Sequence, residues 1–284
     1  MHIVITDSGV GGLSVCAYAE RFVRTHGFRE PVRLTFANAA PANDYGYNSM
    51  RSHQEKVETF DRFLRNVTER FAPDSIYVAC NTLSVLLPEM NHPDVKGIVE
   101  TAVHLVLRGL QSDPRSTAMI FGTQTTIDAG AYPRLLQEEG IDPARIVSQA
   151  CPGLADTISE DREGTKTRAE IEKWVAAAVA KMPHRDAPVV ACLACTHYGY
   201  RKELFAAALH NAGIAATVLN PNERAVDDLF GAHSAGPARD VEVNFVTRYA
   251  IPQTTIDALT FFLRDISPRT VSAMQNFEHV PDLF

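Results

Sequence analysis

The sequence predicts an α/β protein of two similar domains, each a mainly parallel sheet flanked by helices. Short apolar, β-branched runs alternate with longer amphipathic stretches, which is typical of parallel sheets. The alternation restarts near Thr117, about one domain length into the chain. Residues 78–82 and 193–197 also share one order: apolar strand, small residue, cysteine, polar residue. Together these observations indicate that one supersecondary plan occurs twice.

The first domain is expected to open with a strand and a helix joined by a glycine-rich turn. The strands expected here are residues 2–6, 32–37 and 75–79, and the helices are residues 11–26 and 48–71. The longer helix is predicted by apolar residues at helical spacing, which are Val57, Phe60, Phe63, Leu64 and Val67. The third strand leads directly into Cys80.

The second half of the chain repeats the alternation. The strands expected are residues 117–121, 145–149, 188–193 and 216–219, and the helices are one that ends near Glu139, then residues 167–182 and 200–212. A last strand over 241–247 and a helix over 254–263 follow. The strand at 188–193 runs into Cys195.

Composition narrows the function classes. The chain has 284 residues, 45% of them hydrophobic, and a formal net charge of -7. General nucleic-acid binding is not expected, because it needs clustered basic residues. No signal peptide and no apolar run of the ~20 residues a membrane span needs are found. The five cysteines are scattered, which fits reduced thiols in the cytoplasm better than a disulfide framework.

Cys80 and Cys195 are the leading candidates for chemistry. Each is expected at the carboxyl end of a parallel strand, the sheet edge where ligands bind in open α/β folds. Two similar domains that face each other would bring the two thiols together. The alternative is that they are ordinary buried cysteines, and we apply that interpretation to Cys16, Cys151 and Cys192.

The turn after the first strand is a candidate anion site. Residues 7–14 read Asp-Ser-Gly-Val-Gly-Gly-Leu-Ser, and glycines let backbone N–H groups approach an anion at a helix start. The run fits the phosphate-loop templates poorly, so a carboxylate is the better ligand. Asp7 is placed to assist a nearby acid/base group. A plain tight turn with Asp7 as a helix cap is the alternative.

Three further segments carry weaker candidates. His197 lies two residues after Cys195, where imidazole can lower the thiol pKa or help carry its proton. Thr123 and Thr126 follow a predicted strand, where their hydroxyls can bind a carboxylate or simply cap a helix. The pair Tyr45–Gly46, which follows the second strand, is the least specific.

No cofactor and no metal are expected. Cys192, Cys195 and His197 resemble part of a zinc site, but Cys192 should lie inside a strand and no second ligand pair is near in sequence. Pyridoxal phosphate needs a Schiff-base lysine, and no lysine is predicted at a strand end with a phosphate-binding partner.

Taken together, these motifs resemble those of the glutamate racemases in the aspartate/glutamate racemase superfamily. The matching segments are residues 6–14, 79–82, 122–127, 130–132, 150–152 and 195–198, in the family's order and spacing. The resemblance implies two α/β domains related by a pseudo-twofold axis, with the active site in the cleft between them. It implies a first domain of residues 1–99 completed by 217–284, and an inserted second domain of residues 100–216.

The resemblance also implies a two-base, cofactor-independent racemase that supplies D-glutamate for peptidoglycan. Cys80 would take the α-proton of D-glutamate and Cys195 that of L-glutamate, with Asp7 supporting Cys80 and His197 supporting Cys195. The substrate-binding residues it implies are Ser8, Asn81, Thr82 and Thr196 for the α-amino and α-carboxylate groups, and Tyr45, Gly46, Thr123 and Thr126 for the distal carboxylate. We expect a small acidic amino acid as partner, no nucleic acid or membrane partner, and a homodimer.

The chain departs from the family at three places. Residues 38–46 carry Asn38 where the family has a carboxylate, and this loop is one residue longer. Residues 199–200 are Gly-Tyr in place of Pro-Leu. In the second domain, the residue that replaces the family's glutamate is open among Asp156, Ser159, Glu160 and Asp161, with Glu160 preferred. A racemase of aspartate or another acidic amino acid therefore remains an alternative. A regulatory binding protein on the same scaffold is a further alternative.

Overall fold

The computed structural model describes residues 1–42, 45–231 and 236–284, which form two compact units. The first unit contains Met1–Ile98 and Asn222–Phe284, and the second contains Val99–Pro221. The chain therefore leaves the first unit once, builds the whole second unit, and returns.

The first unit is built on a six-stranded sheet in the order β10-β9-β2-β1-β3-β4. The strands are β1 (His2–Asp7), β2 (Val32–Asn38), β3 (Ser75–Val78), β4 (Val95–Gly97), β9 (Val241–Thr247) and β10 (Glu278–His279). All of the neighbouring pairs are parallel. At the centre, Ile5 lies between Phe36 and Tyr77, and all three are buried. This register aligns the carboxyl ends of β1, β2 and β3 along one edge.

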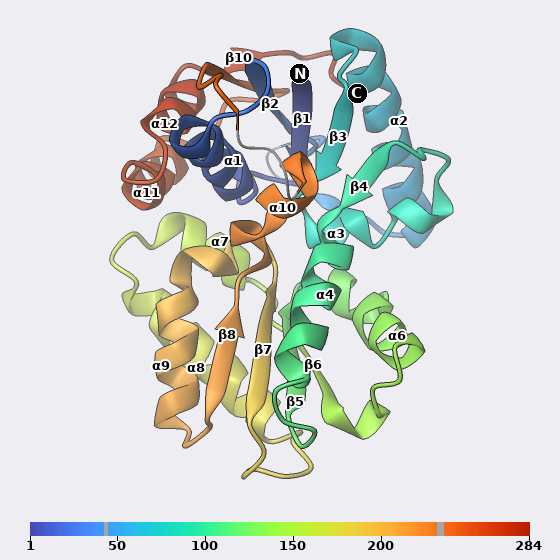
Figure 1. Cartoon of the computed structure of the whole chain (residues 1–284), viewed down its shortest axis with the longest axis vertical. Coiled ribbons are helices and arrows are strands. Elements are labelled where there is room, and N and C mark those ends of the chain that lie inside the picture. The colour runs from blue at the N-terminus through green and yellow to red at the C-terminus, as the bar shows by residue number, and fades with distance from the viewer. Residues whose placement is uncertain (43–44, 232–235) are drawn as a thin grey trace. The chain divides into compact units, whose positions relative to one another are not determined.

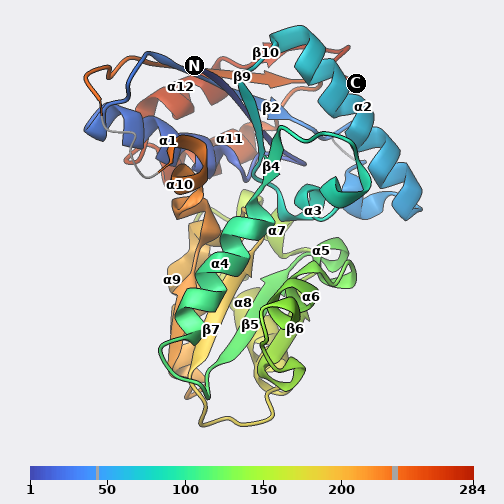
Figure 2. The ribbon, with the colours of Figure 1, turned by 45° about the vertical axis from the view of Figure 1, so that its right-hand side comes forward.

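Helices cover both faces of this sheet (Figures 1 and 2). They are α1 (Leu13–His26), α2 (His53–Phe71), α3 (Asn81–Ser84), α10 (Ala225–Phe230), α11 (Gln253–Leu263) and α12 (Pro268–Gln275), with short 3-10 helices η1 (Tyr47–Ser49), η2 (Leu87–Glu89) and η5 (Pro221–Glu223). Helices α1, α11 and α12 lie on one face, and α2 lies on the other. The Ser52 side chain accepts a hydrogen bond from the Glu55 N–H and so fixes the start of α2.

The second unit is built on a four-stranded parallel sheet in the order β6-β5-β7-β8. The strands are β5 (Thr117–Gly122), β6 (Ile146–Ala150), β7 (Val189–Ala194) and β8 (Ala216–Leu219). Both central strands, β5 and β7, are buried over their whole length, as their continuous apolar sequences require.

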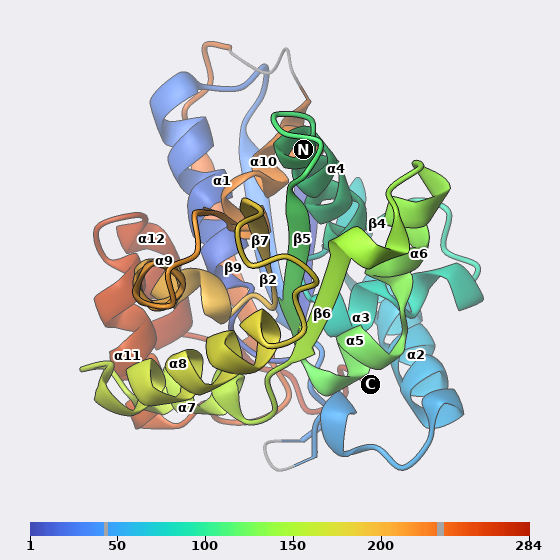
Figure 3. The same cartoon turned by 90° about the horizontal axis from the view of Figure 1, so that it is seen from below.

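Helices also cover both faces of the second sheet (Figure 3). They are α4 (Ile98–Leu110), α5 (Gln124–Asp128), α6 (Ala131–Glu138), α7 (Leu154–Glu160), α8 (Thr165–Val179) and α9 (Lys202–Asn211), with 3-10 helices η3 (Pro143–Arg145) and η4 (Tyr198–Arg201). Helices α8 and α9 lie on one face, and α4 and α6 lie on the other. Gly109 of α4 lies so close to Val190 that an added Cβ would come within 2.8 Å of it.

The predicted fold class is confirmed, because each unit is a parallel sheet flanked by helices. Several predicted boundaries are wrong, however. The single helix expected through Glu139 is two helices, since Gly130 between them adopts φ 64°, a left-handed conformation. The helix expected from residue 48 starts at His53, and η1 precedes it.

The return to the first unit also comes later than expected. Strand β8 pairs with β7, so residues 217–221 lie in the second unit and not in the first. No helix in the three described ranges has both the length and the hydrophobicity that a membrane span requires.

Candidate active site

In the first unit, the chemistry-bearing residues gather where β1 and β3 end. Asp7 is the last residue of β1, and Cys80 follows β3 by two positions. The strands are neighbours, and the Ala79 N–H donates to the Thr6 carbonyl at 2.9 Å. As a result, the Ser8 hydroxyl lies 3.1 Å from the Cys80 sulfur. The structure thus brings together three of the residues that the sequence singled out.

Asp7 is a buried carboxylate with its own structural partner. The residue is 1% exposed, and its Oδ1 accepts a hydrogen bond from the Gly9 N–H at 2.9 Å. A Cβ at Gly12 would come within 2.8 Å of Asp7 and 3.1 Å of Ala79. The last glycine of the turn is therefore needed for space, so that the start of α1 can pack against the carboxylate.

Burial holds Cys80 as a neutral thiol. The pKa of Cys80 is raised to about 12, first because the sulfur is buried and second because Asp7 is negatively charged. Hydrogen bonds from the Ser8 side chain and from the backbone N–H groups of Ser8 and Leu83 act in the opposite direction. These donors are oriented to stabilise a thiolate once other groups favour it.

Asn81 and Thr82 begin α3 directly after Cys80, and both are almost fully buried. Tyr45 is turned toward α2 instead, because its hydroxyl donates to Glu55 Oε1 at 2.7 Å. Gly46 precedes η1 in an extended conformation with no atom within 4 Å of an added Cβ. Asn43 and Asp44 of the same loop lie outside the described residues.

Asn38, where the resemblance implies a carboxylate, is hydrogen-bonded through both the nitrogen and the oxygen of its amide. Its amide nitrogen donates to the Thr247 and Tyr249 hydroxyls at 3.3 and 3.2 Å, and its Oδ1 accepts from the Ala40 N–H at 2.9 Å. Burial raises the pKa of Tyr249, and the negative charge of Asp7 adds to the rise. Tyr249 therefore lies near the end of β1, where Asp7 stands.

In the second unit, Cys195 directly follows β7 and is 6% exposed, and Thr196 beside it is also buried. On the neighbouring strand β5, Thr123 caps α5 by accepting a hydrogen bond from the Thr126 N–H at 3.2 Å. The two threonine hydroxyls lie 3.0 Å apart. Cys195 and Thr196 therefore follow the end of β7, while Thr123 follows the end of the adjacent strand β5 and Thr126 lies in the helix that begins there.

Tyr198 joins the three strand ends of this sheet. Its N–H donates to the Cys195 carbonyl, while its hydroxyl lies 3.4 Å from the Gly122 carbonyl and 3.2 Å from the Cys151 carbonyl. Burial raises the pKa of Tyr198 well above its usual range, and electrostatic interactions with Cys195 and Cys151 add to the rise. In the sequence Tyr198 was visible only as part of a motif, and its bridging role needed the sheet order.

His197 is partly buried and immediately precedes η4. Desolvation lowers the pKa of His197 to about 4, so the imidazole is neutral at pH 7. A neutral imidazole offers one donor and one acceptor nitrogen, so it can pass a proton but supplies no positive charge. Of the two roles expected for it, proton transfer fits this state better than lowering a thiol pKa by charge.

The other cysteines fit the core interpretation. Cys16, Cys151 and Cys192 are all buried, and burial raises the pKa of each to about 12. Cys192 lies inside β7 and has a hydrogen bond to the Tyr132 side chain. Within the described ranges, no three His, Cys, Asp or Glu side chains are grouped as metal ligands would be.

The other two places where the sequence departs from the glutamate racemases can also be located in the structure. Gly199 faces Asn220 so closely that an added Cβ would lie 2.6 Å from its amide atoms, so a larger residue there would require the Asn220 side chain to move. Just beyond α7, Asp161 accepts from the Gly164 and Thr167 N–H groups and is committed to the start of α8. Asp156 helps raise the pKa of Tyr198, so its charge reaches the strand ends.

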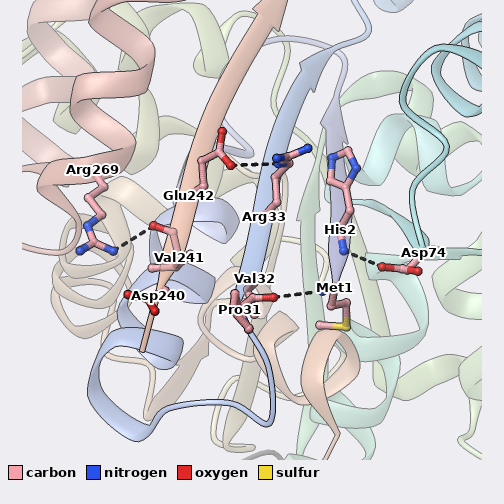
Figure 4. Close-up of a pocket in the computed structure, with 10 residues that line it drawn as sticks. All are labelled: Met1, His2, Pro31, Val32, Arg33, Asp74, Asp240, Val241, Glu242 and Arg269. Carbon is pink, nitrogen blue, oxygen red and sulfur yellow. Dashed lines mark hydrogen bonds and ion pairs between the residues drawn. The ribbon is translucent and has the colours of Figure 1, made fainter. Parts of the chain in front are cut away.

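A pocket of 580 Å³ lies at the opposite edge of the first sheet (Figure 4). Met1, His2, Arg33 and Glu242 line it near the amino ends of β1, β2 and β9. Its polar groups pair with one another, for example Arg33 with Glu242 at 2.9 Å. None of the predicted site residues lines this pocket, and parallel sheets bind ligands at the other edge.

Known proteins that resemble this chain in sequence are glutamate racemases. The chain is 28% identical over 235 residues to the glutamate racemase of a Nitratiruptor species, covering 81% of this chain and 83% of that protein. It is 29% identical over 209 residues to the glutamate racemase of Aquifex pyrophilus, covering 72% and 73%. No family model matches the sequence.

Solved structures show the same fold. The glutamate racemase isoform RacE1 of Bacillus anthracis superposes with a TM-score of 0.71 at 21% identity, covering 92% of this chain and 93% of that one. The glutamate racemase of Aquifex pyrophilus superposes with a TM-score of 0.67 at 24% identity, covering 93% and 95%.

These relatives, together with the fold, define the class: the chain is an amino-acid racemase, an isomerase. Within that class, the resemblance to the glutamate racemases that the motifs indicated is confirmed.

Proposed function

We propose that the chain interconverts L- and D-glutamate with Cys80 and Cys195 as its two acid/base groups and without a cofactor. The observation that carries the proposal is the repeated placement of one cysteine, followed by a buried polar residue, at the end of a strand in each parallel sheet. The substrate follows from the relatives, which are glutamate racemases.

Inversion at Cα needs two groups, because a single base returns the proton to the face it came from. In the proposed step, the Cα–H bond breaks, its proton passes to a thiolate, and the electron pair remains on the substrate as a carbanion. The second cysteine then donates its S–H proton to the opposite face and becomes the thiolate. Enzyme protonation is thus reversed after each turnover, and no redox change occurs.

At the Cys80 edge, Ser8 and the backbone N–H groups would hold the thiolate, while Asp7 would receive or return its proton. Asn81 and Thr82 follow Cys80 and would bind the α-amino and α-carboxylate groups, together with Ser8. We propose that Cys80 acts on D-glutamate.

At the Cys195 edge, the neutral imidazole of His197 would exchange a proton with the thiol. Thr196 would bind the α-substituents, and Thr123 and Thr126 would bind the distal carboxylate with the Tyr45–Gly46 segment. Asp156 is the better choice than Glu160 for the second unit's carboxylate, since its charge acts on Tyr198. We propose that Cys195 acts on L-glutamate.

We propose one active site for the two cysteines and a cellular role for the product. The two edges would form one cleft, and the D-glutamate produced would serve peptidoglycan synthesis in the cytoplasm. A homodimer also stays a prediction. Size-exclusion chromatography with light scattering measures that state directly.

Aspartate is the second candidate substrate. Residues 38–46 depart from the family in sequence and length, and the Tyr45 hydroxyl is engaged by Glu55. A changed loop near the expected distal-carboxylate position is compatible with a shorter acid.

A circular-dichroism assay on a substrate panel tests both candidates. Optical activity should be lost from L-glutamate and from D-glutamate, with slower change for either enantiomer of aspartate. If the optical signal is lost with aspartate and not with glutamate, aspartate is the substrate. A protein that changes no acidic amino acid would contradict the proposal.

A further inference from the structure

Tyr47 carries a buried hydroxyl that the fold does not use. It opens η1, one residue after the Tyr45–Gly46 segment, and is 1% exposed. Its ring packs edge-to-face on Phe60, with centroids 6.1 Å apart. Within the described part of the chain, the hydroxyl oxygen has no hydrogen-bond partner.

An unmet buried hydroxyl is unusual in a folded protein. Nearly all buried polar groups are hydrogen-bonded, because burying one without a partner forfeits its bonds to water. Tyr77, a buried tyrosine of the same unit, has its hydroxyl 3.5 Å from Asp228 Oδ2. Phenylalanine would fill the same space against Phe60 without the hydroxyl, so the oxygen of Tyr47 indicates a partner outside the chain.

The hydroxyl lies near the candidate active site. Burial raises the pKa of Tyr47, and the negative charge that Cys80 carries in its thiolate form adds to that rise, which places the two side chains within electrostatic reach. The phenol is therefore neutral at pH 7 and remains a donor. Tyr45, the tyrosine that the motif singled out, already donates to Glu55. In this segment Tyr47 is thus the tyrosine with an uncommitted hydroxyl.

We propose that Tyr47 is a substrate-binding residue whose hydroxyl donates a hydrogen bond to a carboxylate oxygen of the acidic amino acid held beside Cys80. The inference rests on the proposed function, which takes the Cys80 edge as part of the substrate site. A carboxylate is the acceptor that suits this donor best, because charge-assisted hydrogen bonds are short and strong. An amino acid without that carboxylate would leave the Tyr47 hydroxyl without a partner and would bind more weakly. The hydroxyl would therefore favour acidic substrates.

The test compares Tyr47→Phe with the matched control Tyr77→Phe. The KM for L-glutamate of Tyr47→Phe should rise about 10-fold to 100-fold, the range expected for a lost hydrogen bond to a charged group. Its melting temperature without substrate should equal or exceed that of the wild type, because no bond in the empty protein is lost. Tyr77→Phe should keep its KM and melt lower.

The outcomes separate this inference from the function it rests on. A Tyr47→Phe protein with wild-type KM and a lowered melting temperature would overturn the inference, since the hydroxyl would then serve the fold alone. Unchanged KM with unchanged stability would overturn it as well. Failure of the proposed function would appear in the wild type, as absent turnover of glutamate. If the wild type turns over aspartate instead, the same KM comparison with aspartate decides the role of Tyr47.

Discussion

The two cysteine-bearing strand ends have similar sequences but different surroundings. Cys80 has a serine hydroxyl at 3.1 Å and a buried carboxylate, Asp7, whose charge raises the thiol pKa. Cys195 has a neutral histidine two residues on and a tyrosine that joins three strand ends. Neither edge relies on a cation from these neighbours. The same strand-end sequence therefore lies beside a buried carboxylate in the first unit and two residues before a neutral histidine in the second.

Removing either thiol should have the largest effect. Cys80→Ser and Cys195→Ser should each lower kcat about 10²-fold to 10⁴-fold, the usual contribution of acid/base catalysis, because a serine hydroxyl is a much weaker acid. Circular dichroism with L-glutamate and with D-glutamate measures the loss. Cys192→Ser, a buried cysteine inside β7, is the control and should stay active. Full activity in both site variants would end the two-thiol account.

Changing the partner of each thiol should cost less and should be asymmetric. Asp7→Asn should lower kcat/KM about 10²-fold, equally in both directions because enantiomers have equal free energy. The asymmetry should appear in the primary deuterium isotope effect, which should increase most for D-glutamate deuterated at Cα. His197→Asn should show the larger increase for deuterated L-glutamate. Equal isotope effects in both variants would mean that the two partners are not divided between the thiols.

The neutral state of His197 predicts an acid-sensitive fold. Its pKa is about 4 in the folded protein and about 6.5 when unfolded, so between these values the unfolded chain binds more protons. Stability should therefore fall as pH drops from 6.5 to 4, with about 1–3 kcal/mol due to this residue. Urea unfolding of wild type and His197→Asn at pH 7, 5.5 and 4.5 measures it. Parallel losses in both proteins would contradict the assignment.

The smallest effect is expected at the tyrosine that joins the strand ends. Tyr198→Phe removes the hydroxyl contacts to the Gly122 and Cys151 carbonyls, which keep their backbone N–H donors, and should destabilise the fold by about 1–2 kcal/mol. The free energy of unfolding in urea measures the loss. A variant as stable as the wild type would show that the tyrosine hydroxyl adds no stability to those backbone hydrogen bonds.

The features predictable from the sequence were those with a local signal. Strand periodicity placed Asp7, Cys80 and Cys195 at strand ends, and sheet order then brought Ser8 to Cys80. One local signal was missed, because Gly130 divides one expected helix and glycine is the residue that most often takes the left-handed conformation at a helix end. Features that depend on distant packing were not predictable.

The roles of Asn38, Tyr47 and Tyr198 likewise depend on residues far away in sequence. Asn38 bonds to Thr247 and Tyr249 on the returning segment, and this required the three-dimensional fold. A tyrosine directly after the Tyr45–Gly46 motif was visible in the sequence, but its burial against Phe60 was not.

Deuterium incorporation during racemisation in deuterated water tests the central claim most directly. Two thiols on opposite faces predict that, early in the reaction from L-glutamate, the D-glutamate formed carries deuterium at Cα while the remaining L-glutamate does not. Mass spectrometry of the separated enantiomers measures both. Equal early incorporation into L-glutamate and D-glutamate would indicate one base serving both faces, and would contradict the two-thiol account.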